Sequence, residues 1–314
     1  MNPLTGIYAA GTSLRNKLFD RGMLRSRRLT RPVISVGNLS VGGSGKTPFV
    51  IALGELLIQR GIQVDVLSRG YRRKTHGVLV VEPDGTASDF GDEPLLIARR
   101  LSVPVIVGES RYEAGRLAEA RFSLQAHLLD DGLQHRSLAR DFDIALLAPG
   151  DLGDRLLPSG RLREPLSSLQ RADAVIVPEN FAIDHPALQG KPVWRMRREI
   201  GIDQMRQSPI VFCSIAKPQQ FFAQVRTAGV TAAAEIAFRD HHAYGRNDIQ
   251  QLLDAQRAHN AGGFLTTEKD LVNLGEYRQA LNPLSVAVLR VTIERAADLV
   301  DTILARIAER RPRS

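Results

Sequence analysis

The chain has 314 residues, a length that suggests two domains of ordinary size. Hydrophobic residues make up 43% of it and charged residues 24%, which excludes a wholly disordered chain or a fibrous repeat. The 42 Lys and Arg residues outnumber the 34 Asp and Glu residues, so a partner with phosphate groups or an anionic surface is favoured. The single cysteine, Cys213, excludes an internal disulfide and a multi-cysteine metal site, and it indicates a reducing compartment.

Residues 1–31 have the pattern of a basic amphipathic helix. Arg and Lys are frequent in this segment, and Asp20 is its one acidic residue. Such a helix can lie in a membrane interface, or it can pack on its own domain with a solvated basic face. No stretch approaches the ~20 apolar residues that cross a bilayer, and Arg15 and Lys17 interrupt any secretory signal. We therefore expect a cytosolic protein or one on the inner face of a membrane. The apolar positions with helical spacing are Leu4, Ile7, Tyr8, Leu14 and Leu18.

Residues 32–203 alternate short apolar runs with helical segments, which is the pattern of an α/β fold. Several of the runs show little alternation, as expected of parallel strands that are covered on both faces. A helix is predicted over residues 47–59, with Gly61 just beyond its end. Strands are predicted at residues 33–36, 64–67, 103–107, 127–130, 144–147 and 174–177. The segment is therefore predicted to be a mostly parallel sheet of the P-loop NTPase type, with helices on both faces.

Residues 204–314 repeat the alternation more briefly, and they predict a second, smaller α/β lobe. Residues 204–209 are a plausible hinge between the two parts. The predicted strands of this lobe are residues 210–215, 235–238, 264–267 and 286–289, and the predicted helices are residues 248–258 and 293–308.

The strongest local signal is the glycine-rich loop that joins the predicted strand at residues 33–36 to the predicted helix at residues 47–59. Backbone N–H groups in such a glycine-rich loop bind phosphate oxygens, while Lys46 would reach the β- and γ-phosphates and Thr47 would ligate Mg²⁺. The general motif has glycine where this chain has Ser40, so the loop is a variant, and the alternative is a glycine-rich turn without a ligand. The predicted nucleotide-binding residues are Ser40, Val41, Gly42, Gly43, Ser44, Gly45, Lys46 and Thr47.

One pair of acidic residues follows a predicted strand, and another pair precedes a predicted helix. Asp130 and Asp131 end an apolar strand, where they could hold Mg²⁺ or form no more than a turn. Asp92 and Glu93 precede a helix, where either could accept a proton from a hydroxyl group or simply favour the helix N-terminus. Residues 238–244 contain adjacent histidines, for which a partnership with a carboxylate is a better interpretation than a zinc site.

Arg69, Tyr71 and Arg72 follow the strand at residues 64–67. Ligands of doubly wound sheets bind at this end of the strands, so these side chains could clamp an anionic substrate group. The alternative is a solvated basic turn. Residues 160–165, with sequence GRLREP, form a similar basic loop that is ambiguous by itself.

Seven motifs in a fixed order resemble those of the tetraacyldisaccharide 4'-kinases of lipid A biosynthesis. The resemblance extends from the N-terminal helix to about residue 270 and includes Ser40 in the phosphate-binding loop. The motifs are GNLSVGGSGKTP at residues 37–48, SRGY at 68–71, GDEP at 91–94, DDGLQH at 130–135, GRLREP at 160–165, FRDH at 238–241 and TTEKD at 266–270.

The resemblance implies an ATP-dependent kinase that phosphorylates the 4'-hydroxyl of a tetraacyldisaccharide 1-phosphate and forms lipid IVA. It implies two α/β lobes with the nucleotide between them, and an N-terminal helix at the cytoplasmic face of the inner membrane. It assigns Asp92 as general base, with His241 as its partner. By the same resemblance Thr47, Asp130, Asp131 and Glu164 serve the Mg²⁺ site, and Arg69, Tyr71 and Arg72 contact the substrate.

Three other functions are compatible with parts of the sequence. A P-loop ATPase or GTPase switch would share the loop and the acids, but the order of residues 267–270 does not fit a guanine-specific motif. A kinase of a soluble metabolite would not need the basic N-terminal helix. A nucleic-acid module is disfavoured, since aromatic residues make up only 5% of the chain. No obligate protein partner is indicated.

Overall fold

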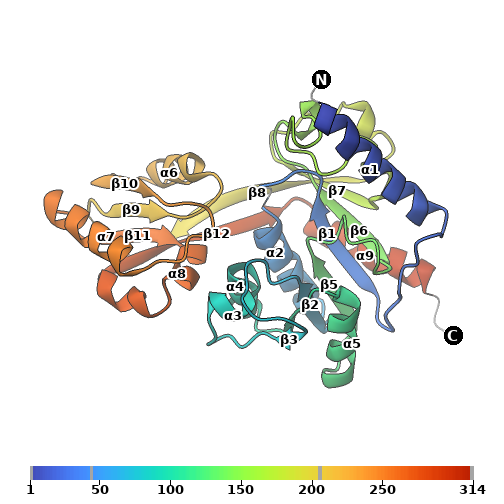
Figure 1. Cartoon of the computed structure of the whole chain (residues 1–314), viewed down its shortest axis with the longest axis horizontal. Helices are drawn as coiled ribbons and strands as arrows, with labels where there is room; N and C mark the ends of the chain where they lie inside the picture. The colour runs from blue at the N-terminus through green and yellow to red at the C-terminus, as the bar shows by residue number, and fades with distance from the viewer. Residues whose placement is uncertain (1–2, 43–44, 204–206, 312–314) are drawn as a thin grey trace.

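The computed structural model describes residues 3–42, 45–203 and 207–311 (Figure 1). Within these ranges, twelve strands form one mixed sheet. In chain order the strands are β1 (Val33–Asn38), β2 (Val64–Ser68), β3 (Leu79–Val80), β4 (Val105–Val107), β5 (Ala126–Asp130), β6 (Phe142–Leu146), β7 (Ala174–Pro178), β8 (Val193–Ile202), β9 (Ile210–Cys213), β10 (Ala234–Ala237), β11 (Phe264–Thr267) and β12 (Leu284–Ile293).

The order across the sheet is β10-β9-β11-β12-β8-β7-β6-β1-β5-β2-β4-β3. Neighbouring strands are parallel except for β12 with β8 and β4 with β3. The prediction of a mostly parallel α/β sheet is confirmed. β8 and β12 pair along most of their length and run from one lobe to the other, so this two-stranded ribbon connects the lobes (Figure 1).

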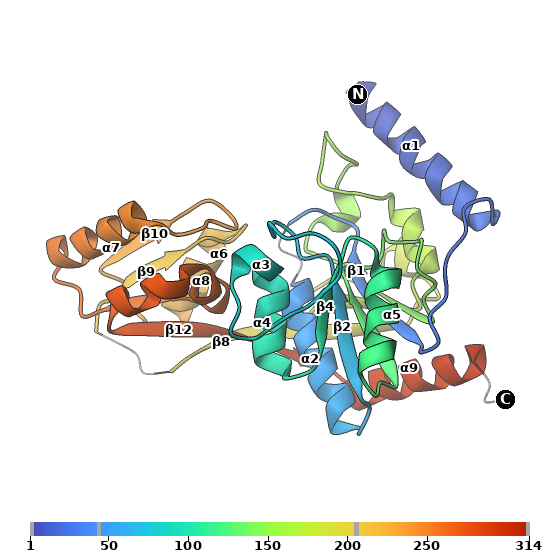
Figure 2. The same ribbon diagram turned by 60° about the horizontal axis from the view of Figure 1, so that its bottom comes forward.

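Each of the two lobes carries helices. The larger lobe carries α1 (Pro3–Asp20), α2 (Lys46–Gln59), α3 (Ala87–Phe90), α4 (Asp92–Leu101), α5 (Arg111–Arg121) and α9 (Ala296–Arg310), and the smaller lobe carries α6 (Pro218–Thr227), α7 (Arg246–Ala258) and α8 (Glu268–Leu274) (Figures 1 and 2). Short 3-10 helices are found at Asp151–Gly153, Leu166–Arg171, Pro186–Leu188 and Gly275–Leu281.

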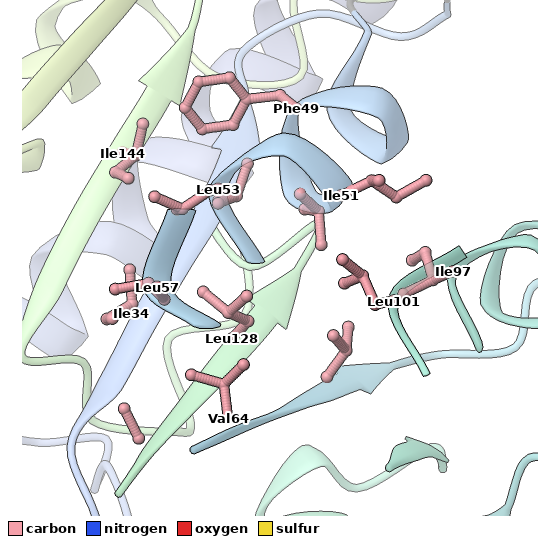
Figure 3. Close-up of a cluster of buried hydrophobic side chains, with 14 of the residues drawn as sticks. Ile34, Phe49, Ile51, Leu53, Leu57, Val64, Ile97, Leu101, Leu128 and Ile144 are labelled. Atoms are coloured by element: carbon pink, nitrogen blue, oxygen red, sulfur yellow. The ribbon is translucent and has the colours of Figure 1, made fainter. Parts of the chain in front are cut away.

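The main core forms where α2 packs on the sheet of the larger lobe. Leu53 and Leu57 of α2 lie against Ile34 of β1 and Leu128 of β5, and all four side chains are fully buried (Figure 3). On the other face of the same strands, Leu67 and Leu129 pack with apolar residues of α5. This burial on both faces explains why the apolar residues of β1, β2 and β5 show little alternation in the sequence.

The last helix, α9, packs on the larger lobe, whereas the predicted division at residue 204 placed it in the smaller lobe. Leu299, Val300 and Ile303 of α9 are buried in the same core as Ile34 and Phe49 of the larger lobe. The reason is that β12 runs out of the smaller lobe and returns the chain to the larger sheet, where the apolar face of α9 is covered. Residues 204–206, part of the predicted hinge, lie outside the described residues.

Helix α1 covers Pro3–Asp20 and is shorter than the 31-residue segment read from the sequence. Its apolar side chains are not packed into a core, since Ile7 is 70% exposed and Leu14 is 60% exposed. Beyond the helix the chain continues as an arm in which Leu29 is buried beneath α5. In the part of the chain that the structure describes, no helix is long and apolar enough to span a membrane.

Candidate active site

A cavity of about 1180 Å³ is lined by residues of both lobes and of the β8–β12 ribbon. The larger lobe contributes the phosphate-binding loop, the start of α4 and the segment after β5, and the smaller lobe contributes the segments before α6 and at the start of α8. The predicted site residues among its lining are Ser40, Val41, Gly42, Gly45, Lys46, Thr47, Arg69, Tyr71, Arg72, Asp92, Asp130, Asp131 and His241.

The predicted phosphate-binding loop joins β1 to α2, as expected. Gly45 precedes α2 with φ of +82°, a left-handed conformation that glycine adopts without strain. No side chain caps α2, so the N–H groups of its first turn are available to an anion. Lys46 donates to Asn38 Oδ1 at 2.9 Å and lies 3.5 Å from Asp131 Oδ1. Gly43 and Ser44 lie outside the described residues.

The serine that replaces the usual first glycine of the loop has a structural partner. Ser40 is fully buried, and its hydroxyl donates to Asp151 Oδ2 at 3.2 Å. The same carboxylate oxygen accepts from the Ala148 N–H at 2.8 Å. Val41 N–H donates to the Arg161 carbonyl at 2.8 Å. The beginning of the loop is therefore fixed to the segment after β6, and the serine is used for this attachment.

The two acids after β5 lie beside this loop because β5 is the neighbour of β1, with Asp130 opposite Val36. The end of β1 and the segment after β5 pack closely, since a Cβ on Gly37 would lie 2.5 Å from Leu133 Cβ. Asp130 is 3% exposed, and burial, together with the charges of Glu93 and Asp131, raises its pKa to about 7.

Asp131 has the opposite electrostatic environment. Burial opposes its ionisation, but Arg163 at 2.8 Å and Lys46 at 3.5 Å outweigh it and hold the pKa of Asp131 well below its usual range. The two neighbouring carboxylates thus differ at neutral pH, with Asp131 firmly ionised and Asp130 near its midpoint.

The residues at this position fit a Mg²⁺ ion. Asp130 Oδ1 is buried and has no hydrogen-bond partner in the described structure, and Thr47 lines the same cavity. Carboxylate and hydroxyl oxygens suit Mg²⁺, which commonly takes only one or two carboxylates together with phosphate and water. Accordingly, no group of three or more His, Cys, Asp or Glu residues that could hold a metal occurs within the described ranges.

The structure does not bring Glu164 to this site, although the family resemblance assigns it there. Its buried carboxylate accepts from Arg171 at 2.6 Å and from Asn16 of α1 at 3.0 Å through the same oxygen. It is not among the described residues that line the cavity. The ion pair with Arg171 neutralises the charge, so Glu164 acts in this structure as an anchor for α1.

Asp92 and His241 meet across the lobes, although 149 positions separate them. His241 Nδ1 lies 2.7 Å from Asp92 Oδ2, and Asn273 Nδ2 donates to the same oxygen at 3.3 Å. Asp92 is 5% exposed. Burial favours its neutral form, but the His241 hydrogen bond and the charge of Lys269 at 3.6 Å outweigh burial and lower the pKa of Asp92. His242 is turned to other partners, because it bonds to Asp248 at 2.9 Å.

The three residues predicted to contact the substrate have different surroundings. Arg72 donates to the carbonyl groups of Asp240 and His241 at 2.7 and 3.2 Å, so it ties the lobes together. Tyr71 is 54% exposed and its ring meets the His241 ring edge-on at 5.5 Å. Arg69 lines the cavity and has no ion-pair partner among the described residues.

Sequence reasoning missed two cationic residues that belong to the cavity. The Arg198 guanidinium of β8 packs on the phosphate-binding loop, where a Cβ on Gly45 would lie 2.9 Å from its Nη1, and it has no hydrogen-bond or ion-pair partner in the described ranges. Lys269 at the start of α8 contacts Asp92 and His241. Lys269 lies in a segment identified only by its motif, Arg198 lies where no element was predicted, and no spacing rule relates either residue to the loop.

Comparisons with known proteins identify the family of the chain. A family model described as tetraacyldisaccharide-1-P 4'-kinase matches residues 1–308. The chain belongs to this family. It is 47% identical to the tetraacyldisaccharide 4'-kinase of Koribacter versatilis, covering 99% of both chains, and 38% identical to that of Aquifex aeolicus, covering 89% of this chain and 91% of the other.

A solved structure extends the agreement to the fold. The crystal structure of the Aquifex aeolicus family member in complex with ATP is similar to this chain with a TM-score of 0.81, at 35% identity, covering 97% of this chain and 98% of that one. The predictions of the family, of the α/β fold and of kinase activity are therefore confirmed.

Proposed function

We propose that the protein transfers the γ-phosphoryl group of ATP to the 4'-hydroxyl of a tetraacyldisaccharide 1-phosphate, a lipid A precursor, and forms lipid IVA at the cytoplasmic face of the inner membrane. One observation carries this proposal: the variant phosphate-binding loop and Asp92 of the larger lobe line a single cavity together with His241 of the smaller lobe, which bonds to Asp92. Family membership supports the acceptor, and the ATP complex of the Aquifex aeolicus protein supports the donor.

The triphosphate binds to the N-terminus of α2. Main-chain N–H groups there and the Lys46 ammonium group bind the phosphate oxygens, and the guanidinium of Arg198 adds a positive charge beside Gly45. Thr47, Asp130 and Asp131 would hold Mg²⁺, which supplies positive charge to the β- and γ-phosphates when bound.

Asp92 receives the proton of the acceptor hydroxyl group. The bond from the 4'-oxygen to the γ-phosphorus forms, the bond from the γ-phosphorus to the β–γ bridging oxygen breaks, and the proton passes to the Asp92 carboxylate. A carboxylate with a lowered pKa is a weak base, which suits a loose transition state in which the hydroxyl proton leaves late. The hydrogen bond between His241 and Asp92 orients the carboxylate.

The lipid acceptor explains the position of α1. On its inner side Tyr8 Oη donates to the Arg163 carbonyl at 3.0 Å and Arg15 donates to the Gln134 carbonyl at 2.7 Å. Arg163 and Gln134 both line the cavity. The exposed apolar side chains of α1 are thus held beside the site, where they can enter a bilayer while the sugar reaches the cavity.

The test is transfer of label from γ-labelled ATP to the detergent-dispersed tetraacyldisaccharide 1-phosphate. We expect labelled lipid, and we expect the fully deacylated disaccharide to be a poor acceptor because it cannot partition with α1. Lys46→Ala should lose most of the transfer. Label that appears only as free phosphate would indicate an ATPase switch, and equal use of the deacylated sugar would indicate a kinase of soluble metabolites.

A further inference from the structure

We propose that Lys269 is a positioning residue that fixes the tautomer of His241 and so completes the catalytic base from the smaller lobe. This inference rests on the proposed role of Asp92. The Lys269 side chain is 17% exposed and lies among three carboxylates and one imidazole. Its Nζ is 3.1 Å from His241 Nε2, 3.6 Å from Asp92 Oδ2 and from Glu93 Oε1, and 3.7 Å from Asp240 Oδ1.

The tautomer follows from the donor and acceptor capacity of the groups. A lysine ammonium group has three N–H donors and no acceptor, so at 3.1 Å it donates to His241 Nε2. Nε2 must then carry a lone pair, and the single imidazole proton is on Nδ1. Nδ1 therefore donates to Asp92 Oδ2 at 2.7 Å, and the carboxylate accepts as an anion.

This arrangement limits where the substrate proton can go. With Nδ1 protonated and Nε2 occupied by Lys269, His241 has no free position for a second proton. The proton from the acceptor hydroxyl group therefore stays on Asp92 during the transfer, and His241 orients the carboxylate without relaying the proton. Lys269 also keeps Asp92 ionised before the reaction, because its charge lowers the pKa of that carboxyl.

The position of Lys269 is set by a rigid part of the smaller lobe. It lies in the first turn of α8, where Thr267 caps the helix by accepting from Asp270 N–H at 3.1 Å. Asp270 is fully buried and accepts from Ser214 N–H at 2.8 Å and from Tyr244 Oη at 2.9 Å. Because α8 is anchored in this way, the ammonium group is held beside His241 within the smaller lobe, and both groups reach Asp92 only while the lobes are in contact.

Charged and aromatic groups of four segments face His241. Without Lys269, Nε2 would face the Asp240 carboxylate, whose Oδ2 lies 3.9 Å from it. The groups are Asp92 and Glu93 of α4, Asp240 of the same loop, Lys269 of α8, and Tyr71 and Arg72 of the segment after β2.

The test is ¹⁵N NMR of the full-length protein labelled at histidine, with the His241 signals assigned by their loss in His241→Asn. We expect a protonated Nδ1 and an unprotonated, hydrogen-bonded Nε2 at pH 7. In Lys269→Met the Nε2 signal should move toward the protonated form, and Lys269→Arg should restore the wild-type pattern. A protonated Nε2 in the wild type, or no response to Lys269→Met, would overturn the inference.

Kinetics separate this inference from the proposed function. In Lys269→Met, with Mg²⁺ and ATP saturating, the acidic limb of the kcat profile should move to higher pH by about one unit, since Asp92 loses a cation at 3.6 Å. Lys74→Met, at a position outside the cavity lining, should leave the limb in place. If Asp92→Asn is inactive while Lys269→Met shifts neither the limb nor the tautomer, the role of Lys269 is refuted and that of Asp92 stands. If Asp92→Asn is fully active, the proposed base itself is wrong.

Discussion

Replacing Asp130 with Asn should stabilise the nucleotide-free protein and weaken its binding of Mg²⁺ and ATP. The carboxyl is 3% exposed, has one oxygen without a hydrogen-bond partner in the described structure, and lies near two further carboxylates. Asn keeps the shape of the side chain and the bond from Ser68, but it cannot become charged. The site therefore carries a cost in stability that Mg²⁺ and ATP would offset.

The size of this cost follows from the pKa of Asp130, which burial and neighbouring charges raise to about 7. The unfolded chain titrates near 3.9, so between about pH 4 and pH 7 the folded protein holds a proton that the unfolded chain has lost, and stability falls as the pH rises. Three pKa units correspond to about 4 kcal/mol at pH 8, as an upper limit, and to less than half of that at pH 5. The gain from Asp130→Asn should therefore grow with pH.

The assay is urea unfolding at pH 5 and pH 8 without nucleotide. Trp194, the one tryptophan of the chain, is buried in the core of the larger lobe, so its fluorescence reports the unfolding of the lobe that holds Asp130. Asp131→Asn is the matched control and should destabilise the protein at pH 8, because the pKa of Asp131 is lowered. A gain for Asp130→Asn that is absent, or the same at both pH values, would refute the reasoning.

Three further predictions concern the ligands. Arg198→Ala should raise the Kd for ATP about 10-fold or more, because a charge-assisted contact to phosphate is lost. Arg290→Ala, on the same ribbon, is the control and should leave the Kd unchanged. Isothermal titration calorimetry measures both values, and equal effects would contradict the role of Arg198. Ile7→Glu combined with Leu14→Glu should abolish sedimentation with anionic liposomes, and unchanged sedimentation would place the contact elsewhere. Ile58→Glu, at an exposed position of α2, is the control. Mg²⁺ affinity should fall as the pH drops below 7, because the most buried carboxylate of that site takes up a proton there, and a pH-independent affinity would contradict this.

The fold could be predicted from the sequence wherever burial on both faces leaves mostly apolar residues with little alternation. β1, β2 and β5 are covered in this way, and their pattern predicted a parallel sheet. β8 was missed because only alternate residues such as Trp194 and Met196 are buried, and the arginines near them interrupt the apolar pattern. α5 was missed because its buried face is small, formed by residues such as Ala114 and Ala118.

The candidate site could likewise be predicted only in part. The phosphate-binding loop is local, so its residues and its place between a strand and a helix could be predicted. Contacts between lobes depend on how β8 and β12 align the two halves, and no spacing in the sequence encodes that alignment. The contacts of His241 and Lys269 with Asp92 are therefore visible only in the structure. For Glu164 the motif predicted a role in the Mg²⁺ site, but in the structure its carboxylate accepts a hydrogen bond from Arg171.

In the proposed mechanism Asp92 is the base, and other residues of the site hold the nucleotide. The most direct measurement compares kcat and the ATP dissociation constant of Asp92→Asn with those of the wild type. We predict that kcat falls by about 10²- to 10⁴-fold, the usual contribution of a positioned base, while the dissociation constant for ATP changes little. A variant with nearly full kcat, or one that loses ATP binding as strongly as it loses turnover, would contradict the account.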